Sequence, residues 1–143
     1  MGGQNKSGYA LDTCTQINTW KNPNVGNFLS WNSDMRNSTL YIPEITIYES
    51  QRKGFDTIEI LSSIKKSFST KVKISPITIS MHLMAGQLEN RCPLLHPGDS
   101  AILAFCIETH TTLVTYDKAL IESCKIIGVP VINLQQIPME VIS

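Results

Sequence analysis

The chain has 143 residues, of which 42% are hydrophobic and 17% are charged, and its 12 basic and 12 acidic residues cancel. This length suits one domain with a buried core, this composition excludes a disordered chain, and the neutral balance gives no global attraction to a polyanion. The four cysteines form no C-x-x-C pair, which disfavours a zinc ribbon or a dithiol redox site. No apolar run approaches the roughly 20 residues of a membrane span, and the first residues contain no hydrophobic signal core. We therefore expect a cytoplasmic protein with no membrane segment.

The first third of the chain predicts a tail, a strand and an irregular region. Residues 1–8 are expected to form a disordered N-terminal tail, and residues 9–143 a single domain. The apolar run at residues 9–11 predicts a buried strand that ends at Asp12. Residues 18–38 are rich in asparagine, and we expect a loop and an irregular helix there.

A second strand, at residues 39–42, is expected to lead into a helix. Pro43 suits the first helical position because it has no N–H to lose there, and Glu44 favours the same helix start. This helix should run to about Lys53, where Gly54 marks its end. The next helix begins near Asp56 and should bury a stripe at three- and four-residue spacing. That stripe consists of Ile58, Leu61, Ile64 and Phe68.

The second half of the chain repeats this alternation of strand and helix. A strand at residues 71–77 precedes a helix at residues 78–91, and Asp99 begins a strongly apolar helix after a loop. The last elements are a strand at residues 111–116, a helix at 118–127 and a strand at 129–133. Alternation without hairpin turns predicts the α/β class, as a three-layer α/β/α domain with a roughly five-stranded parallel sheet.

Four acidic residues stand at or near the ends of these predicted elements. Asp12 and Asp117 end the first and fourth strands, and ligands of a parallel sheet gather at such carboxyl ends. Glu49 lies on the helix after the second strand, and Asp99 heads a later helix. Each has an ordinary explanation: a helix N-cap for Asp99 and Asp117, a polar turn for Asp12, and a solvated helix residue for Glu49.

Brought together, these carboxylates would need a compensating cation, because like charges raise one another's pKa. Hard oxygen ligands without a nearby Cys or His pair suit Mg²⁺ or Mn²⁺ rather than zinc. Metals held in this way activate water and stabilise charge on a phosphodiester. The acids therefore indicate metal-assisted phosphodiester hydrolysis.

Several motifs resemble, in order, the blocks of the PIN-domain family, and most of all the VapC-type toxins of toxin–antitoxin pairs. The matching segments are residues 10–13 (ALDT), 42–49 (IPEITIYE) with Gly54, 97–104 (PGDSAILA), 113–117 (LVTYD) and 128–132 (GVPVI). The resemblance covers about residues 9–134, although the asparagine-rich segment departs from it and Ser100 stands where alanine is common.

This resemblance implies a PIN-like, Rossmann-like fold and a Mg²⁺- or Mn²⁺-dependent ribonuclease. It also implies an RNA substrate, a homodimer and a possible cognate antitoxin. Carried across to this sequence, the metal-site and catalytic acids are Asp12, Glu49, Asp99 and Asp117, with Thr115 as a supporting hydroxyl. Glu44 is an alternative to Glu49, but a surface carboxylate at a helix start explains it more simply.

Two other functions compete with the nuclease hypothesis. A phosphatase of the haloacid dehalogenase type also has an aspartate after its first strand, but it needs a second one two positions later, where this chain has Cys14. A catalytically silent PIN-like module that binds RNA or protein is the second alternative, although the presence of all four acids is not expected of a decayed site.

A cluster of basic residues also has two interpretations. It is either a solvated helix face or a shelf that holds a phosphate backbone beside the acids. The cluster consists of Arg52, Lys53, Lys65, Lys66, Lys71 and Lys73.

Overall fold

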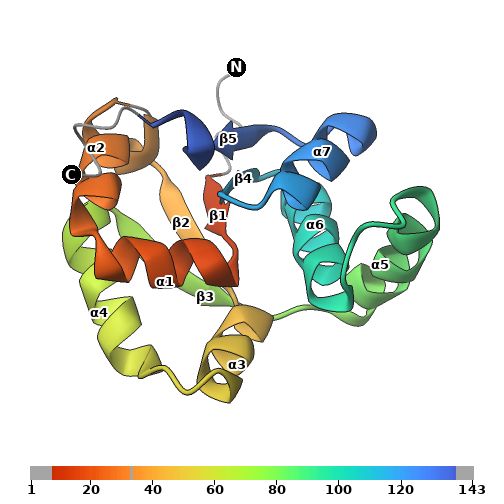
Figure 1. Cartoon of the computed structure of the whole chain (residues 1–143), viewed down its shortest axis with the longest axis horizontal. Helices are drawn as coiled ribbons and strands as arrows, with labels where there is room; N and C mark the ends of the chain where they lie inside the picture. Colours follow the sequence, from red (N-terminus) through yellow and green to blue (C-terminus); the bar gives the residue numbers. More distant parts are fainter. Residues whose placement is uncertain (1–7, 33, 138–143) are drawn as a thin grey trace.

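The computed structural model describes residues 8–32 and 34–137, which form a five-stranded parallel sheet covered by helices on both faces (Figure 1). The strands are β1 (Tyr9–Leu11), β2 (Thr39–Pro43), β3 (Lys71–Ser75), β4 (Thr112–Thr115) and β5 (Val131–Asn133). The α-helices are α1 (Thr13–Lys21), α2 (Pro23–Asn32), α3 (Glu44–Arg52), α4 (Thr57–Phe68), α5 (Ile79–Arg91), α6 (Pro97–Thr109) and α7 (Lys118–Ile127). Two short 3-10 helices are η2 (Asp34–Asn37) and η3 (Leu134–Gln136). The predicted three-layer α/β/α fold with a parallel sheet is confirmed.

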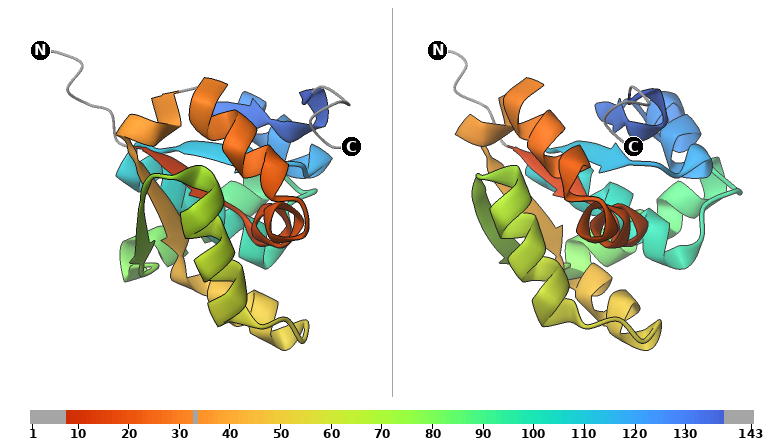
Figure 2. Two further views of the ribbon diagram at one scale, coloured as in Figure 1. Left: turned by 90° about the vertical axis from the view of Figure 1, so that its left-hand side faces the viewer. Right: turned by 60° about the vertical axis from the view of Figure 1, so that its left-hand side comes forward.

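The core is divided between the two faces of the sheet, because successive strand side chains point to opposite sides. Ala10 and Leu113 pack with α5, α6 and α7, whereas Leu11 and Val114 pack with α1, α2 and α4. Figure 2 shows α4 lying against β2 and β3 at one edge of the sheet. Burial on both faces explains why β1 and the centre of β4 are apolar.

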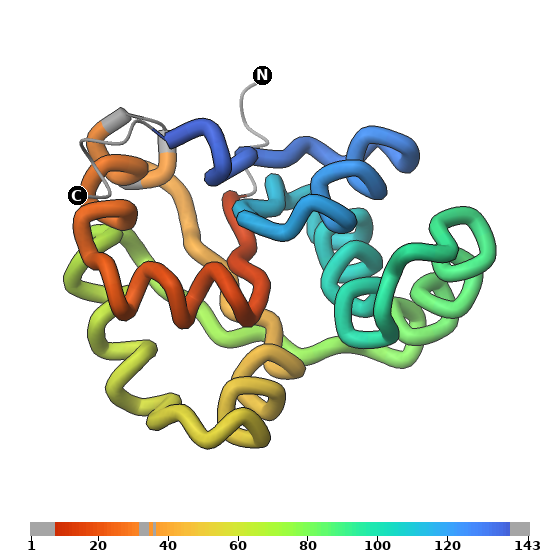
Figure 3. The backbone as a smooth tube through the Cα atoms, in the orientation of Figure 1, coloured from red at the N-terminus to blue at the C-terminus, as the bar shows by residue number. Residues whose placement is uncertain are grey.

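The order of the strands, β3-β2-β1-β4-β5, reverses its direction between β1 and β4. The first half of the chain builds outward from β1 to β3. After β3 the chain passes to the other face (Figure 3) and returns to build β4 and β5. Crevices form at such a switch point, outside the carboxyl ends of the strands. Here Leu11 pairs with Val114, so the residues that follow both strands emerge side by side.

The asparagine-rich segment at residues 18–38 is not the loop and irregular helix that we expected. It forms the C-terminal part of α1, the whole of α2 and the 3-10 helix η2. The side chain of Asp12 caps α1, and Pro23 occupies the first position of α2. Ile17 and Val25 are buried against α4 and the sheet. Tertiary burial therefore outweighs the weak helix propensity of asparagine.

Three further expectations about helices are corrected by the structure. Pro43 ends β2 and precedes α3 instead of opening it. His96 rather than Asp99 is the N-cap residue of α6, because Pro97 takes the first helical position and leaves Asp99 in the first turn. Ile58 is 81% exposed, and Ile60 occupies the buried stripe of α4 in its place. The predicted helix end at Gly54 is confirmed, since its φ of +87° lies in the left-handed region.

Most of the tail expected at residues 1–8, and the end of the domain expected to reach residue 143, lie outside the described residues. Gly8 is buried, and its carbonyl accepts a hydrogen bond from the Thr112 N–H at 3.0 Å. Within residues 8–32 and 34–137, no helix has both the length and the apolar character needed to cross a bilayer.

Candidate active site

Asp12 is held by donors on both of its carboxylate oxygens. It follows β1 and is only 3% exposed. Its Oδ1 accepts a hydrogen bond from the Thr15 N–H at 3.0 Å, and its Oδ2 accepts one from the Thr115 hydroxyl at 2.8 Å. Burial raises the pKa of Asp12, although the hydrogen bonds from Thr15 and Thr115 favour the carboxylate. This carboxylate is therefore fixed in direction.

Thr115 joins the ends of β1 and β4. It is the last residue of β4, it is fully buried, and its hydroxyl accepts a hydrogen bond from the Asp117 N–H at 3.0 Å while donating to Asp12. Asp117 in turn caps α7 by accepting a hydrogen bond from the Leu120 N–H at 3.1 Å, as the sequence predicts. The parallel register of β1 and β4 thus places Asp12 and Asp117 on the same rim of the sheet.

Asp99 lies in the first turn of α6, which packs on the opposite face of the sheet from α1. Its pKa is raised to about 6, mainly by burial and additionally by the negative charges of Asp117 and Asp12. A carboxylate near the positive end of a helix is otherwise well placed. The raised pKa therefore reflects a half-buried position close to two other carboxylates.

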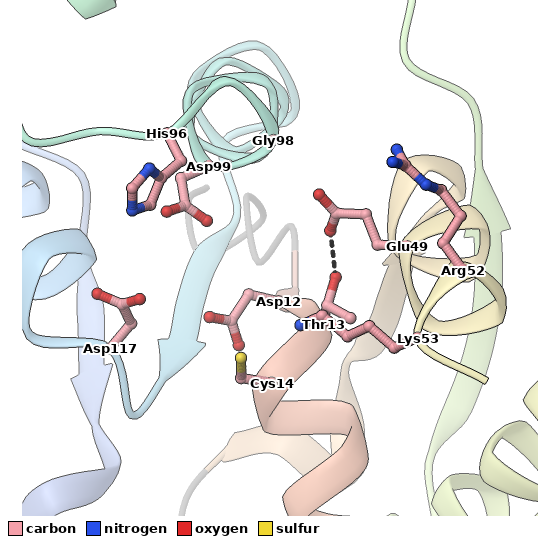
Figure 4. Close-up of a pocket in the computed structure, with 10 residues that line it drawn as sticks. All are labelled: Asp12, Thr13, Cys14, Glu49, Arg52, Lys53, His96, Gly98, Asp99 and Asp117. Atoms are coloured by element: carbon pink, nitrogen blue, oxygen red, sulfur yellow. Dashed lines mark hydrogen bonds between the residues drawn. The ribbon is translucent and has the colours of Figure 1, made fainter. Parts of the chain in front are cut away.

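Glu49 is the fourth acid of the group and lies on α3. Its Oε1 accepts a hydrogen bond from the Thr13 hydroxyl, which belongs to the first turn of α1 (Figure 4). Glu44, the alternative to Glu49, is exposed and does not line the same pocket.

All four predicted acids line one open pocket of about 440 Å³ (Figure 4). Its lining residues are Asp12, Thr13, Cys14, Glu49, Arg52, Lys53, His96, Gly98, Asp99 and Asp117. Thr115 lies behind Asp12 instead of in the wall of the pocket. Among the lining residues that sequence reasoning did not assign to the site, Thr13 and Gly98 stand directly beside an acid in the motifs quoted above.

The expected basic shelf is divided by the structure. Arg52 and Lys53 line the acid pocket at the end of α3. Lys65 lines a different groove, between α4 and β3, together with Val72 and Ile74. Only part of the basic cluster thus stands next to the acids.

The residues present fit a hard divalent cation by the chemistry of their donors. Four carboxylates supply oxygen ligands, whereas the one thiol in the pocket, Cys14, stays protonated because burial raises its pKa. In the described part of the chain, no three acidic, His or Cys side chains are already close enough to grip an ion. The acids instead surround the pocket, which is the arrangement expected of like charges that repel one another.

Comparison with known proteins places this geometry in a family. No curated protein matches the chain by sequence. Among solved structures, VapBC2 from Rickettsia felis bound to a promoter DNA fragment is 21% identical, with a TM-score of 0.62, over 87% of this chain and 97% of that one. VapBC-1 from nontypeable Haemophilus influenzae is 18% identical, with a TM-score of 0.66, over 90% and 98%. FitAcB from Neisseria gonorrhoeae is 19% identical, with a TM-score of 0.60, over 90% and 99%.

These likenesses establish the fold, and the family model establishes the relationship. The model of the PIN domain matches residues 9–125, which include all four acids of the pocket. The chain belongs to the PIN-domain family.

Proposed function

We propose that this protein is an endoribonuclease that depends on Mg²⁺ or Mn²⁺ and is the toxin of a toxin–antitoxin pair. The observation that carries the proposal is the convergence of Asp12, Glu49, Asp99 and Asp117 on one pocket from separate parts of the chain. Such a group of buried and half-buried acids costs stability unless a ligand compensates its charge. A function that binds a cation would explain why the four acids lie together.

The roles of the residues follow from their positions. Asp12, Glu49, Asp99 and Asp117 are the groups that would hold the cation, and a bound cation would activate water and neutralise charge on the phosphodiester. Thr115 keeps the Asp12 carboxylate turned toward the pocket. Arg52 and Lys53 line the pocket near Glu49, at the end of α3, where they would bind the phosphates of the substrate.

The biological assignment rests on resemblance. The motifs resemble those of VapC-type toxins, and two of the solved structures named above are VapBC complexes. On this basis we assign an RNA substrate, a cognate antitoxin, a homodimer and a cytoplasmic location. Light scattering on the purified protein tests the dimer, and co-purification with the product of a neighbouring gene tests the antitoxin.

The second candidate is a catalytically silent PIN-like module that binds RNA or protein. It keeps the fold and the basic residues but needs no cation. The two functions differ in whether Mn²⁺ binding and RNA cleavage depend on the acids.

The deciding experiment is a Mn²⁺ titration together with a cleavage assay on short single-stranded RNAs. We expect Asp12→Asn and Asp99→Asn each to weaken Mn²⁺ binding and to slow cleavage by about a hundredfold or more, as loss of a charge-stabilising group does elsewhere. The matched control is Asp56→Asn, because Asp56, like Asp12, is a helix N-cap but is exposed and outside the pocket. If neither pocket variant differs from this control, the protein is not a metal-dependent nuclease.

A further inference from the structure

Gly98 occupies an unusual place in the candidate site. It lies in the first turn of α6, between His96 and Asp99, and it lines the acid pocket. The glycines with positive φ in the described residues are Gly8, Gly54 and Gly128, so Gly98 does not need its freedom to adopt the left-handed region. Its backbone would therefore accept an alanine.

The space beside Gly98 is filled by the Glu49 carboxylate. A Cβ atom built on Gly98 would lie 2.1 Å from Oε2 of Glu49 and 3.2 Å from its Cδ. Figure 4 shows the Glu49 side chain directed at Gly98. The shorter distance is well inside van der Waals contact, so any side chain at position 98 would displace this carboxylate.

Glu49 is also held on its other side. Its Oε1 accepts the hydrogen bond from Thr13, which is buried in the first turn of α1. The carboxylate thus lies between the first turns of two helices, with Thr13 on one side and Gly98 on the other. A shift away from position 98 would alter the Thr13 contact and the direction of the carboxylate into the pocket.

We propose that Gly98 is a positioning residue of the metal site, because its missing side chain makes the room in which the Glu49 carboxylate is held for the cation. This inference rests on the proposed function of the pocket. It gives a reason for a glycine in a helix, where glycine is less favourable than alanine by roughly 0.5–1 kcal/mol. The helix gains nothing from Gly98, whereas Glu49 depends on it.

Gly86 provides a matched control in the neighbouring helix. It lies within α5, and a Cβ atom there would meet nothing within 4 Å. Both Gly98→Ala and Gly86→Ala add the same methyl group to a helix of 13 residues. They differ in whether that group reaches an acid of the pocket.

The test measures Mn²⁺ affinity by electron paramagnetic resonance of the free ion and the unfolding temperature of the full chain. We expect Gly98→Ala to weaken Mn²⁺ binding about 10- to 100-fold, as loss of an outer-shell partner does in other sites. Its unfolding temperature should not fall. Gly86→Ala should keep the affinity of the original protein.

Two backgrounds show whether Gly98 acts through Glu49. In Glu49→Ala protein the obstructed carboxylate is gone, so adding Gly98→Ala should leave the Mn²⁺ affinity unchanged. Thr13→Val should weaken binding, and Thr13→Ser, which keeps the hydroxyl, should restore it. If the original protein binds Mn²⁺, an equal loss from Gly98→Ala in both the original and the Glu49→Ala backgrounds would overturn the proposal, and so would no loss in either.

A crystal structure of the Gly98→Ala variant without metal separates this inference from the proposed function. If the original protein binds no Mn²⁺, only the nuclease proposal is refuted. A displaced Glu49 carboxylate would still support the positioning role. An unmoved carboxylate overturns the positioning role whatever the original protein binds.

Discussion

The two ends of the sheet both carry a cavity, but their contents differ. At the carboxyl ends of β1 and β4, a pocket of about 440 Å³ is lined by acids. At the amino ends of β4 and β5, a cavity of about 580 Å³ is lined largely by apolar groups such as Leu88, Ile107 and Val129. Size alone would select the second cavity as the functional one. The chemistry of the linings selects the first.

The buried titratable groups of the two ends make the same point. Burial raises the pKa of Asp12 at one end, and it raises the pKa of Cys106 to about 12 at the other. Asp12 nevertheless receives two hydrogen bonds that favour its charged form, from Thr15 and Thr115. Cys106 remains a neutral thiol in the apolar core, where only a hydrogen bond with Thr111 opposes the effect of burial on its pKa. Only the carboxyl end is built to keep a charge in the interior.

The substitution Thr115→Val should most strongly reduce the difference between the two ends of the sheet. The substitution keeps the buried shape but leaves Oδ2 of Asp12 without its donor and the Asp117 N–H without its acceptor. We expect Mn²⁺ affinity to fall about 10- to 100-fold, and the free energy of unfolding to fall by about 1–3 kcal/mol. Calorimetric titration and urea unfolding at pH 7 measure the two effects.

Thr115→Ser is the control for that substitution, because it keeps the hydroxyl and loses only a methyl group. It should retain most of the Mn²⁺ affinity. If valine and serine behave alike at position 115, the hydroxyl does not support Asp12 and the carboxyl end owes its special character to something else.

A smaller effect is expected from the basic residues, and it sharpens the position of the substrate. Replacing Arg52 and Lys53 with glutamine should reduce the salt dependence of RNA affinity by about 1.4 in the log–log slope, at roughly 0.7 for each lost contact with a single strand. The same double replacement of Lys65 and Lys66 tests the shelf as the sequence suggested it. An unchanged slope there would remove both lysines from the RNA-binding surface.

The sequence predicts the sheet and the four acids because both depend on short local patterns. Strand ends and helix starts fix where Asp12 and Asp117 emerge, and parallel pairing brings them together. The helices α1 and α2 escaped prediction because their stability comes from burying Ile17 and Val25 against distant elements. Local patterns also do not show which residue pairs touch across the pocket.

Gly98 is an example of a contact across the pocket that local patterns do not show. In the sequence it is one more residue of a Pro-Gly turn ahead of a helix, and nothing links it to α3. Its closeness to the Glu49 carboxylate is set by how α3 and α6 meet, which no spacing records. The same holds for the hydrogen bond between Thr13 and Glu49.

The dependence of stability on pH should reveal the cost of keeping Asp99 and Asp12 charged at the carboxyl end of the sheet. The pKa values of Asp99, at about 6, and of Asp12 lie above the ordinary 3.8, so the folded state holds protons that the unfolded state has released. Between about pH 4 and 6 the free energy of unfolding should therefore fall as pH rises. We expect the unfolding temperature of metal-free protein to be a few degrees lower for this reason at pH 7.5 than at pH 4.5.

Asp99→Asn isolates this contribution from that of other acids, because it removes the titrating group without changing the helix. The difference in unfolding temperature between the variant and the original protein should grow in the variant's favour as pH rises from about 4 to 6, and should then level off. Mn²⁺ at pH 7.5 should raise the unfolding temperature of the original protein more than that of the variant. A difference that does not change with pH would mean that the pKa of Asp99 is not raised in the folded state.

The smallest effect on Mn²⁺ binding at the proposed site should follow a change at the amino end. Cys106→Ala removes one buried sulfur from the apolar cavity and should lower the free energy of unfolding by about 1 kcal/mol, comparable with the loss of one buried methyl group. Its Mn²⁺ affinity should stay within twofold of the original, because Cys106 lies at the other end of the sheet and carries no charge. Thr115→Val and Cys106→Ala should thus both lower the stability of the fold, but only the first should weaken Mn²⁺ binding. A comparable loss of Mn²⁺ affinity in both variants would show that binding follows overall stability instead of the arrangement of the acids.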